Sequence, residues 1–267
     1  MPRATLGLFV TAVLIVVGVF VVGCSADKGV PSPSPSSPLA SPSPPSPSTP
    51  AAPSGAGTTG EPTQAAGGES VRFETDDGMA LEGLLFGDGE DGVVLAHMRP
   101  ASMDSWFPFA RVLAQEGYAA LAFNFRGYGS SEGAGYAVEV DVRAAINALL
   151  ARGASRVFVI GASMGGTGAI AASAGHRAVA GVITLSAPAA FEGVDAMAAI
   201  RQVDRPIMLM AAESDEPYAS NARDLQEATG FAAELIILSG GRHGTDLFAE
   251  HGEALRDTIL GFLADPS

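Results

Sequence analysis

The chain has 267 residues, 47% of them hydrophobic, which is enough to bury a sizeable core. Its formal net charge is −14, from 29 acidic and 15 basic residues, and the basic residues form no stripe that could neutralise phosphates. Nucleic-acid binding is therefore excluded as an expected function, and an acidic, solvated surface is a sufficient explanation of the charge.

Residues 1–23 have the pattern of a secretory signal peptide, in which Arg3 precedes a nearly unbroken apolar run. The run ends in Val21-Val22-Gly23-Cys24, which resembles the lipobox of bacterial lipoproteins. The resemblance implies that Cys24 is lipidated, becomes the mature N-terminus and anchors the protein at the extracytoplasmic face of the cell membrane. An uncleaved membrane anchor and an ordinary signal peptide are the alternatives. Cys24 is the single cysteine, so an intramolecular disulfide is excluded.

Residues 24–68 contain almost no large apolar side chain and are rich in Pro, Ser, Ala, Thr and Gly. Such a segment buries too little surface to offset its ordering entropy, so we predict a disordered, polyproline-biased linker. At about 3.1 Å per residue it could reach on the order of 100 Å from the membrane. The folded domain is predicted over residues 69–267.

Strand-like apolar runs alternate with amphipathic stretches along this domain. The predicted strands are Val71–Thr75, Leu81–Phe86, Val93–Ala96, Ala119–Phe123, Val157–Ile160, Val179–Leu185, Ile207–Met210 and Glu234–Leu238. The predicted helices are Phe107–Glu116, Val138–Ala151, Val194–Val203, Ala219–Thr229 and Leu247–Leu263. The first two strands flank Asp76-Asp77-Gly78 and should form a hairpin. The later alternation predicts an α/β fold, with a mostly parallel sheet and helices on both faces.

One stretch, residues 156–168 (RVFVIGASMGGTG), carries a G-x-S-x-G pattern between a buried strand and a helix. In this context the pattern predicts a nucleophile elbow, a turn so tight that Gly161 and Gly165 must lack side chains. Ser163 would then be exposed at the head of the helix. A serine hydroxyl is a weak nucleophile at neutral pH, so it needs a base that a third group orients.

The partners of Ser163 should follow later strands, because reacting side chains gather at the carboxyl ends of parallel strands. Asp215 lies in the loop after the predicted strand Ile207–Met210, and His243 lies in the loop after Glu234–Leu238. The chain order is serine, aspartate, histidine, which is the order of the α/β-hydrolase triad. Two other acids are candidates for the role of Asp215: Glu213, which lies two residues earlier, and Asp246, which lies three residues after the histidine. Of the three, Asp215 is favoured.

Residues 69–267 resemble a serine α/β-hydrolase, close to the small esterases and dienelactone-hydrolase-like members. The motifs that carry the resemblance are Ala96-His97-Met98-Arg99-Pro100 (for H-G-x-P), Asn124–Ser130 (for D-x-R-G-x-G-x-S), Gly161–Gly165, and the acid and histidine loops Pro206–Asp215 and Gly241–Gly244. It implies that Ser163 attacks an acyl carbonyl, His243 carries the proton and Asp215 orients the imidazole. It also implies an oxyanion hole from the amides of Met164 and Arg99, with Met98 as the other candidate.

Two departures from the family pattern concern shape. Met98 replaces the usual glycine after His97, which could impair the oxyanion hole, and Asn124 replaces an aspartate that has no chemical role. His97 and Arg126 are predicted to brace their loops, Arg126 through an ion pair. No metal site is predicted, because the four histidines show no H-x-x-H spacing, and no cofactor is implied.

About 20 residues separate Leu185 from Pro206, too few for a cap domain, so the site should be open. Residues 187–191 are expected to rim a mildly apolar pocket, and either Arg99 or Arg242 could anchor a substrate carboxylate. We therefore predict a membrane-tethered, monomeric serine hydrolase that acts on small-molecule or polymer-displayed acyl esters. A peptidase or amidase of the same fold and a non-catalytic cell-envelope binding module are the alternatives.

Overall fold

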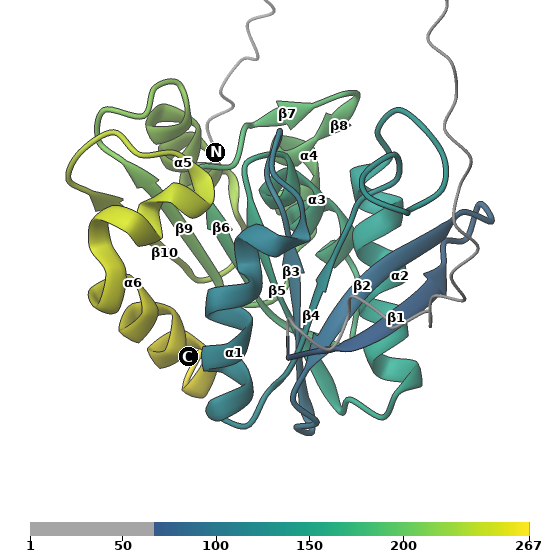
Figure 1. Cartoon of the computed structure of the whole chain (residues 1–267). Helices are drawn as coiled ribbons and strands as arrows, with labels where there is room; N and C mark the ends of the chain where they lie inside the picture. Colours follow the sequence, from purple (N-terminus) through teal and green to yellow (C-terminus); the bar gives the residue numbers. More distant parts are fainter. Residues whose placement is uncertain (1–66, 267) are drawn as a thin grey trace, which may run out of the picture. The chain divides into compact units, whose positions relative to one another are not determined.

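The structure is a computed structural model that describes residues 67–266 (Figure 1). The predicted signal peptide, the Cys24 lipidation site and the linker up to residue 66 lie outside the described residues. None of the helices within residues 67–266 combines the length and the hydropathy needed to cross a membrane.

Eight strands form the central sheet. In spatial order they are β1 (Glu69–Glu74), β2 (Ala80–Phe86), β4 (Ala119–Phe123), β3 (Asp91–Ala96), β5 (Arg156–Ala162), β6 (Val179–Leu185), β9 (Ile207–Ala212) and β10 (Ala233–Leu238). β2 is antiparallel to both β1 and β4, and the other neighbouring pairs are parallel. The predicted N-terminal hairpin and the mostly parallel sheet are confirmed.

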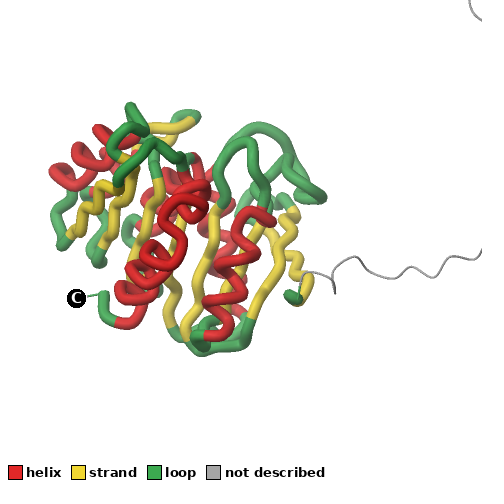
Figure 2. Tube along the Cα trace, turned by 60° about the vertical axis from the view of Figure 1, so that its left-hand side comes forward, coloured by secondary structure: helices red, strands yellow, loops and turns green. Residues whose placement is uncertain are grey.

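Helices cover both faces of the sheet (Figures 1 and 2). One face carries α1 (Phe107–Gln115) and α6 (Leu247–Ala264), and the other carries α2 (Val138–Ala151), α3 (Met164–Ser173), α4 (Ala196–Ile200) and α5 (Tyr218–Ala228). Short 3-10 turns, η2 (Met103–Trp106) and η3 (Gly244–Asp246), precede α1 and α6.

The central strand β5 shows why its sequence is apolar throughout. Val157 and Val159 pack into the core beneath α2 to α5, whereas Phe158 and Ile160 pack into the core beneath α1 and α6. A strand that faces two cores has no solvated side, so it lacks the polar alternation of a surface strand. The register pairs Ala96 at the end of β3 with Gly161 near the end of β5. This register brings the loops that follow both strands together.

The predicted helix Val194–Val203 is shorter in the structure, where α4 covers Ala196–Ile200. The structure has a small hairpin there, β7 (Ala190–Phe191) and β8 (Val194–Asp195), followed by the short helix α4. Glu192 and Gly193 have φ values of 45° and 86°, which turn the chain back on itself. Asp195 then caps α4 by accepting a hydrogen bond from the Ala198 amide at 2.9 Å. This hairpin and helix are the whole insertion, and the fold has no large cap.

Candidate active site

Ser163 occupies a strained turn between β5 and α3. Its φ and ψ are 49° and −119°, a region that non-glycine residues rarely occupy. The turn requires glycine at position 161, because a Cβ atom there would lie 2.2 Å from the Gly165 carbonyl oxygen. The Ser163 backbone is fixed by its amide, which donates to the Leu185 carbonyl at 2.8 Å. The G-x-S-x-G stretch thus has the geometry of a nucleophile elbow.

Gly165 lets the start of α3 approach the end of β3. A Cβ atom at this position would lie 2.3 Å from the Ala96 carbonyl oxygen and 2.8 Å from that of His97. Because α3 begins at Met164, its first amides have no acceptor within the helix and are available to an anion. The predicted oxyanion donors, the Met164 amide and the amides of the loop at Met98 and Arg99, therefore come from two segments in close contact.

Asp215 and His243 are hydrogen-bonded to each other. His243 Nδ1 lies 2.9 Å from one carboxylate oxygen of Asp215 and 3.2 Å from the other. Because a carboxylate accepts hydrogen bonds, Nδ1 is the donor in this contact, and Nε2 is the ring nitrogen that the contact leaves available. The Asp215 side chain is 9% exposed and that of His243 28%, so the acid is shielded while the histidine meets solvent.

Two further contacts hold the histidine loop. The Gly244 amide donates to the Ser186 hydroxyl at 3.0 Å, and Ser186 is itself fixed by its amide, which donates to the Met210 carbonyl at 2.7 Å. The Tyr218 ring lies against the His243 ring, with centroids 4.3 Å apart. The loop after β10 is therefore attached to the loops after β6 and β9.

An open cavity of about 470 Å³ joins these groups. It is lined by Arg99, Ser163, Pro188, Ala190, Phe191, Asp215, Tyr218 and His243. The expected apolar rim over residues 187–191 is thus present in part. Within residues 67–266 the Ser163 hydroxyl forms no hydrogen bond, so it is free to turn toward His243 or a substrate. In unliganded sites such catalytic contacts are often open and tighten when substrate binds.

The model of the alpha/beta hydrolase fold family matches residues 92–258, more than half of the chain. The chain belongs to the α/β hydrolase family. No curated protein sequence matches it significantly.

Several solved structures resemble this one. An esterase of Pyrococcus furiosus has 19% sequence identity and a TM-score of 0.65, with 77% of this chain and 95% of that chain covered. A bacterial membrane phospholipase A has 16% identity and a TM-score of 0.64, covering 76% of this chain and 87% of its own. An esterase of a Rhodococcus species has 17% identity and a TM-score of 0.62, covering 73% and 98% respectively. At these identities the likeness concerns the fold.

Neither rival acid lines the cavity of this α/β hydrolase. Glu213 is exposed, and its carboxylate accepts a hydrogen bond from the Gly240 amide at 3.4 Å. Asp246 is also exposed, in the 3-10 turn before α6. Neither lines the cavity, whereas Asp215 both lines it and contacts His243. The geometry therefore favours Asp215.

Two basic residues near the site have structural partners, as expected. His97 is fully buried, its Nδ1 donates to the Met98 carbonyl at 2.9 Å, and its Nε2 accepts from the Phe125 amide at 3.3 Å. Burial lowers the pKa of His97 to about 4, so the ring is neutral near pH 7. Arg126 is held by ion pairs with Asp141 at 2.7 Å and Asp77 at 2.8 Å. It braces its loop and does not line the cavity.

Met98 does not fill the cavity. Its side chain packs beside Gly244, where a Cβ atom would lie 2.5 Å from the Met98 sulfur. The methionine that replaces the family glycine thus covers the backbone next to His243. The site depends on Gly244, whose φ is 57°, to accommodate it.

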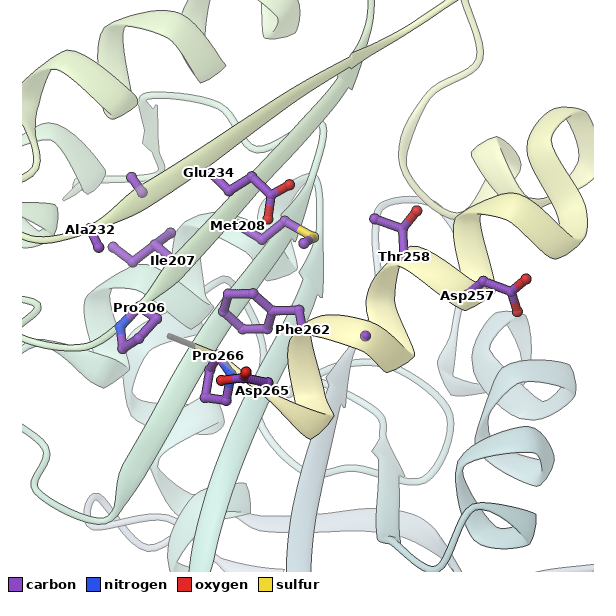
Figure 3. A pocket seen from close by; sticks show the side chains of 12 residues that line it. Pro206, Ile207, Met208, Ala232, Glu234, Asp257, Thr258, Phe262, Asp265 and Pro266 are labelled. Carbon is purple, nitrogen blue, oxygen red and sulfur yellow. The ribbon is translucent and has the colours of Figure 1, made fainter.

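A larger cavity, of about 570 Å³, lies elsewhere, between α6 and the starts of β9 and β10 (Figure 3). Phe262 of α6 faces Met208 and Ile207 there, and Glu234, Asp257 and Asp265 supply its charge. It contains no histidine or cysteine and sits at the amino ends of the strands, so it offers no nucleophile–base pair. Within residues 67–266, no group of three His, Cys, Asp or Glu side chains is placed to hold a metal ion.

Three residues at the site were not predicted from the sequence: Ser186, Tyr218 and Tyr136. Ser186 follows β6, so its place at a strand end was a usable signal. Tyr218 comes three residues after Asp215, where a ring facing the histidine loop could have been anticipated. Tyr136, in the loop before α2, gave no such signal, because only the folded loop brings it beside Arg99.

Proposed function

We propose that the protein is a serine hydrolase that cleaves carboxylic esters through Ser163, His243 and Asp215. The observation that carries the proposal is the convergence of a strained serine and an Asp215-bonded histidine on one open cavity. Strained backbone persists only where the surroundings impose it, and it clusters at active sites. The family and the esterases among the structural neighbours agree with this chemistry.

In the proposed reaction the Ser163 hydroxyl oxygen attacks the acyl carbonyl carbon while its proton passes to Nε2 of His243. The carbonyl π electrons move onto oxygen and return when the bond to the leaving alcohol breaks. The alcohol takes the proton from Nε2. Water then attacks the acyl-enzyme by the same route, which releases the carboxylic acid and returns the proton to Ser163. Asp215 keeps the imidazole in the productive tautomer and stabilises the imidazolium.

The oxyanion is assigned to the Met164 amide and an amide of the loop at Met98 and Arg99. Amides fixed before the reaction stabilise the developing charge without reorganisation. The N-terminus of α3 adds a favourable dipole for the same charge. The close packing of Gly165 against Ala96 and His97 supports this assignment, because it holds both donor segments together.

The experiment that tests the activity is fluorophosphonate labelling of the purified full chain, with a series of p-nitrophenyl esters of rising chain length. We expect labelling and turnover in the wild type and their loss in Ser163→Ala and His243→Ala. His251→Ala is the matched control, since His251 contacts the Ser239 carbonyl outside the cavity. Absence of labelling in folded wild-type protein would overturn the proposal and favour the binding module. Faster cleavage of p-nitroanilides than of esters would favour the amidase.

We also propose that Cys24 tethers the enzyme to the extracytoplasmic face of a bacterial membrane. The support is the sequence Val21-Val22-Gly23-Cys24 after a long apolar run. Substrates would then be small-molecule or polymer-displayed esters within reach of the linker. Cell fractionation of Cys24→Ser tests the anchor: the protein should move from the membrane fraction to the soluble fraction. A variant that stays on the membrane would contradict lipidation at this residue.

A further inference from the structure

The Arg99 side chain is held in the active-site cavity by aromatic groups. One terminal nitrogen, Nη1, donates a hydrogen bond to the Tyr136 hydroxyl at 3.0 Å. The guanidinium carbon lies 5.6 Å from the Tyr136 ring centroid and 5.9 Å from that of Phe191. The two rings meet edge to face at 5.1 Å. This aromatic shelf orients a long, otherwise flexible side chain beside Ser163 and His243, which line the same cavity.

Arg99 has no carboxylate partner among residues 67–266. Other arginines of the fold are neutralised by acids, such as Arg126 by Asp141 and Arg156 by Asp91. The acid that acts electrostatically on Arg99 is Glu192, which is exposed in the turn of the β7–β8 hairpin and forms no ion pair with it. The carboxylate that lines the cavity, Asp215, is engaged by His243.

Of the two arginines that the sequence suggested as anchors, Arg99 lines the cavity and Arg242 does not. Arg242 precedes His243, but its side chain is exposed and lies outside the cavity. The cavity thus presents a positively charged group, Arg99, that forms no ion pair with an acid of the described residues. The net charge of the whole protein, by contrast, is −14. A guanidinium carries five N–H donors, and a single one of them is used by Tyr136.

We infer that Arg99 binds a carboxylate carried by the substrate, so that the preferred esters are anionic. A planar guanidinium on an aromatic shelf matches a carboxylate with two parallel hydrogen bonds. The apolar groups of Pro188, Ala190 and Phe191 would contact the chain between the carboxylate and the ester. This inference rests on the proposed function and adds its substrate class.

The test compares pairs of esters that differ in one charge. On the acyl side these are mono-p-nitrophenyl esters of glutaric, adipic and pimelic acids, each beside its methyl-capped neutral counterpart. On the alcohol side the pair is meta-acetoxybenzoate and its methyl ester. The quantity measured is the ratio of kcat/KM for the anionic ester to that for the neutral one. A general disturbance of the Arg99 loop lowers both rates and cancels in this ratio.

Arg99→Gln should lower the ratio about tenfold in at least one series, because it removes a charge-assisted hydrogen bond to the carboxylate. Arg99→Lys should keep part of the preference, since lysine supplies the charge without the planar fork. Arg242→Gln is the matched control: it removes the same charge outside the cavity and should leave the ratio unchanged. Glu192→Gln should raise the ratio about twofold, because it removes the acid that competes for Arg99.

Two outcomes would overturn the inference. One is an unchanged ratio in Arg99→Gln in both series, with Ser163-dependent hydrolysis of neutral esters intact; the proposed function would then stand alone. The other is an equal fall in Arg99→Gln and Arg242→Gln, which would point to the net charge of the protein and not to a contact. Absence of any Ser163-dependent hydrolysis would overturn the proposed function and this inference with it.

Discussion

Two cavities lie at opposite ends of strand β9, and the side chains that line them differ in chemistry. Ile207 opens the strand and lines the cavity of about 570 Å³, while Asp215 follows its end and lines the cavity of about 470 Å³. The larger cavity is lined by acidic side chains but by no histidine. The smaller one is lined by a serine and by a histidine that is hydrogen-bonded to an aspartate. Volume therefore does not single out the candidate active site. The direction of the strands does, because open α/β sheets bind ligands outside the carboxyl ends of their strands.

Backbone dihedral angles also distinguish the two ends of the sheet. Among residues 67–266, three non-glycine residues have positive φ: Ser163 at 49°, Ser186 at 56° and Glu192 at 45°. Ser163 and Ser186 follow β5 and β6, and Glu192 turns the β7–β8 hairpin beside the cavity. The amino-end cavity lining contains none of them. Strain of this kind costs about 1–3 kcal/mol per residue, so its concentration at one end fits a site that positions reacting groups.

The largest expected effect comes from Asp215→Asn. An amide in place of the carboxylate favours the wrong tautomer of His243, and we expect kcat to fall about 10⁴-fold with the fold retained. Glu213→Gln, two residues earlier on an exposed position, should leave kcat within about twofold of the wild type, as is usual for surface substitutions. Steady-state hydrolysis of p-nitrophenyl esters measures both. Equal losses in the two variants would contradict the assignment of the acid.

The next largest effect concerns the free energy of unfolding and depends on the buried His97. Burial lowers the pKa of His97 from 6.5 to about 4, so the unfolded chain binds a proton that the folded chain refuses between these values. Stability is therefore full above pH 6.5 and is lost as the pH falls toward 4, by about 3 kcal/mol in all.

Urea unfolding across this pH range measures the loss, with His97→Asn as the comparison. The variant should start less stable, because it loses the hydrogen bonds to Met98 and Phe125, but its stability should change less with pH. His176, whose pKa burial also lowers, contributes a smaller slope in both proteins. Parallel curves for wild type and variant would show that His97 titrates normally.

The sequence signals that place candidate residues at the carboxyl ends of the strands are local. A strand that faces two cores needs a continuous apolar run, and the first polar residues after such a run mark its carboxyl end. Asp215 and His243 could be found in this way without knowing the order of the strands. The glycine at position 161 was likewise predictable, since the elbow leaves no room for a side chain.

Other parts of the site depend on contacts that residue patterns do not encode. Positive φ at Ser186 and Glu192 occurs in residue types that rarely adopt it, so neither the backbone conformation of Ser186 nor the β7–β8 hairpin has a sequence signal. The choice between Arg99 and Arg242 needed the position of Tyr136, 37 residues along the chain from Arg99. Such contacts are set by the packing of loops from different strands.

A pair of glycine substitutions compares how closely the chain is packed at the two ends of the sheet. Gly165→Ala adds a Cβ atom 2.3 Å from the Ala96 carbonyl oxygen and should lower the free energy of unfolding by about 1–3 kcal/mol. Gly261→Ala, in α6 at the amino-end cavity, meets nothing within 4 Å and should raise it by about 0.5–1 kcal/mol. Both sites are helical, so helix propensity favours alanine in each. Thermal or urea unfolding measures both, and stabilisation by both would mean that α3 and β3 are less closely packed.

The smallest predicted effect uses two buried serines. Ser186→Ala leaves the Gly244 amide without its acceptor, so we expect a loss of about 1–2 kcal/mol in stability and a fall of about tenfold in kcat/KM as the His243 loop loosens. Ser173→Ala removes a buried hydroxyl that has no partner within residues 67–266, so stability should stay equal or rise slightly, with full activity. Kinetics well below the unfolding temperature separate positioning from folding. If Ser186→Ala lost stability but kept its activity, Ser186 would support the fold without positioning the histidine.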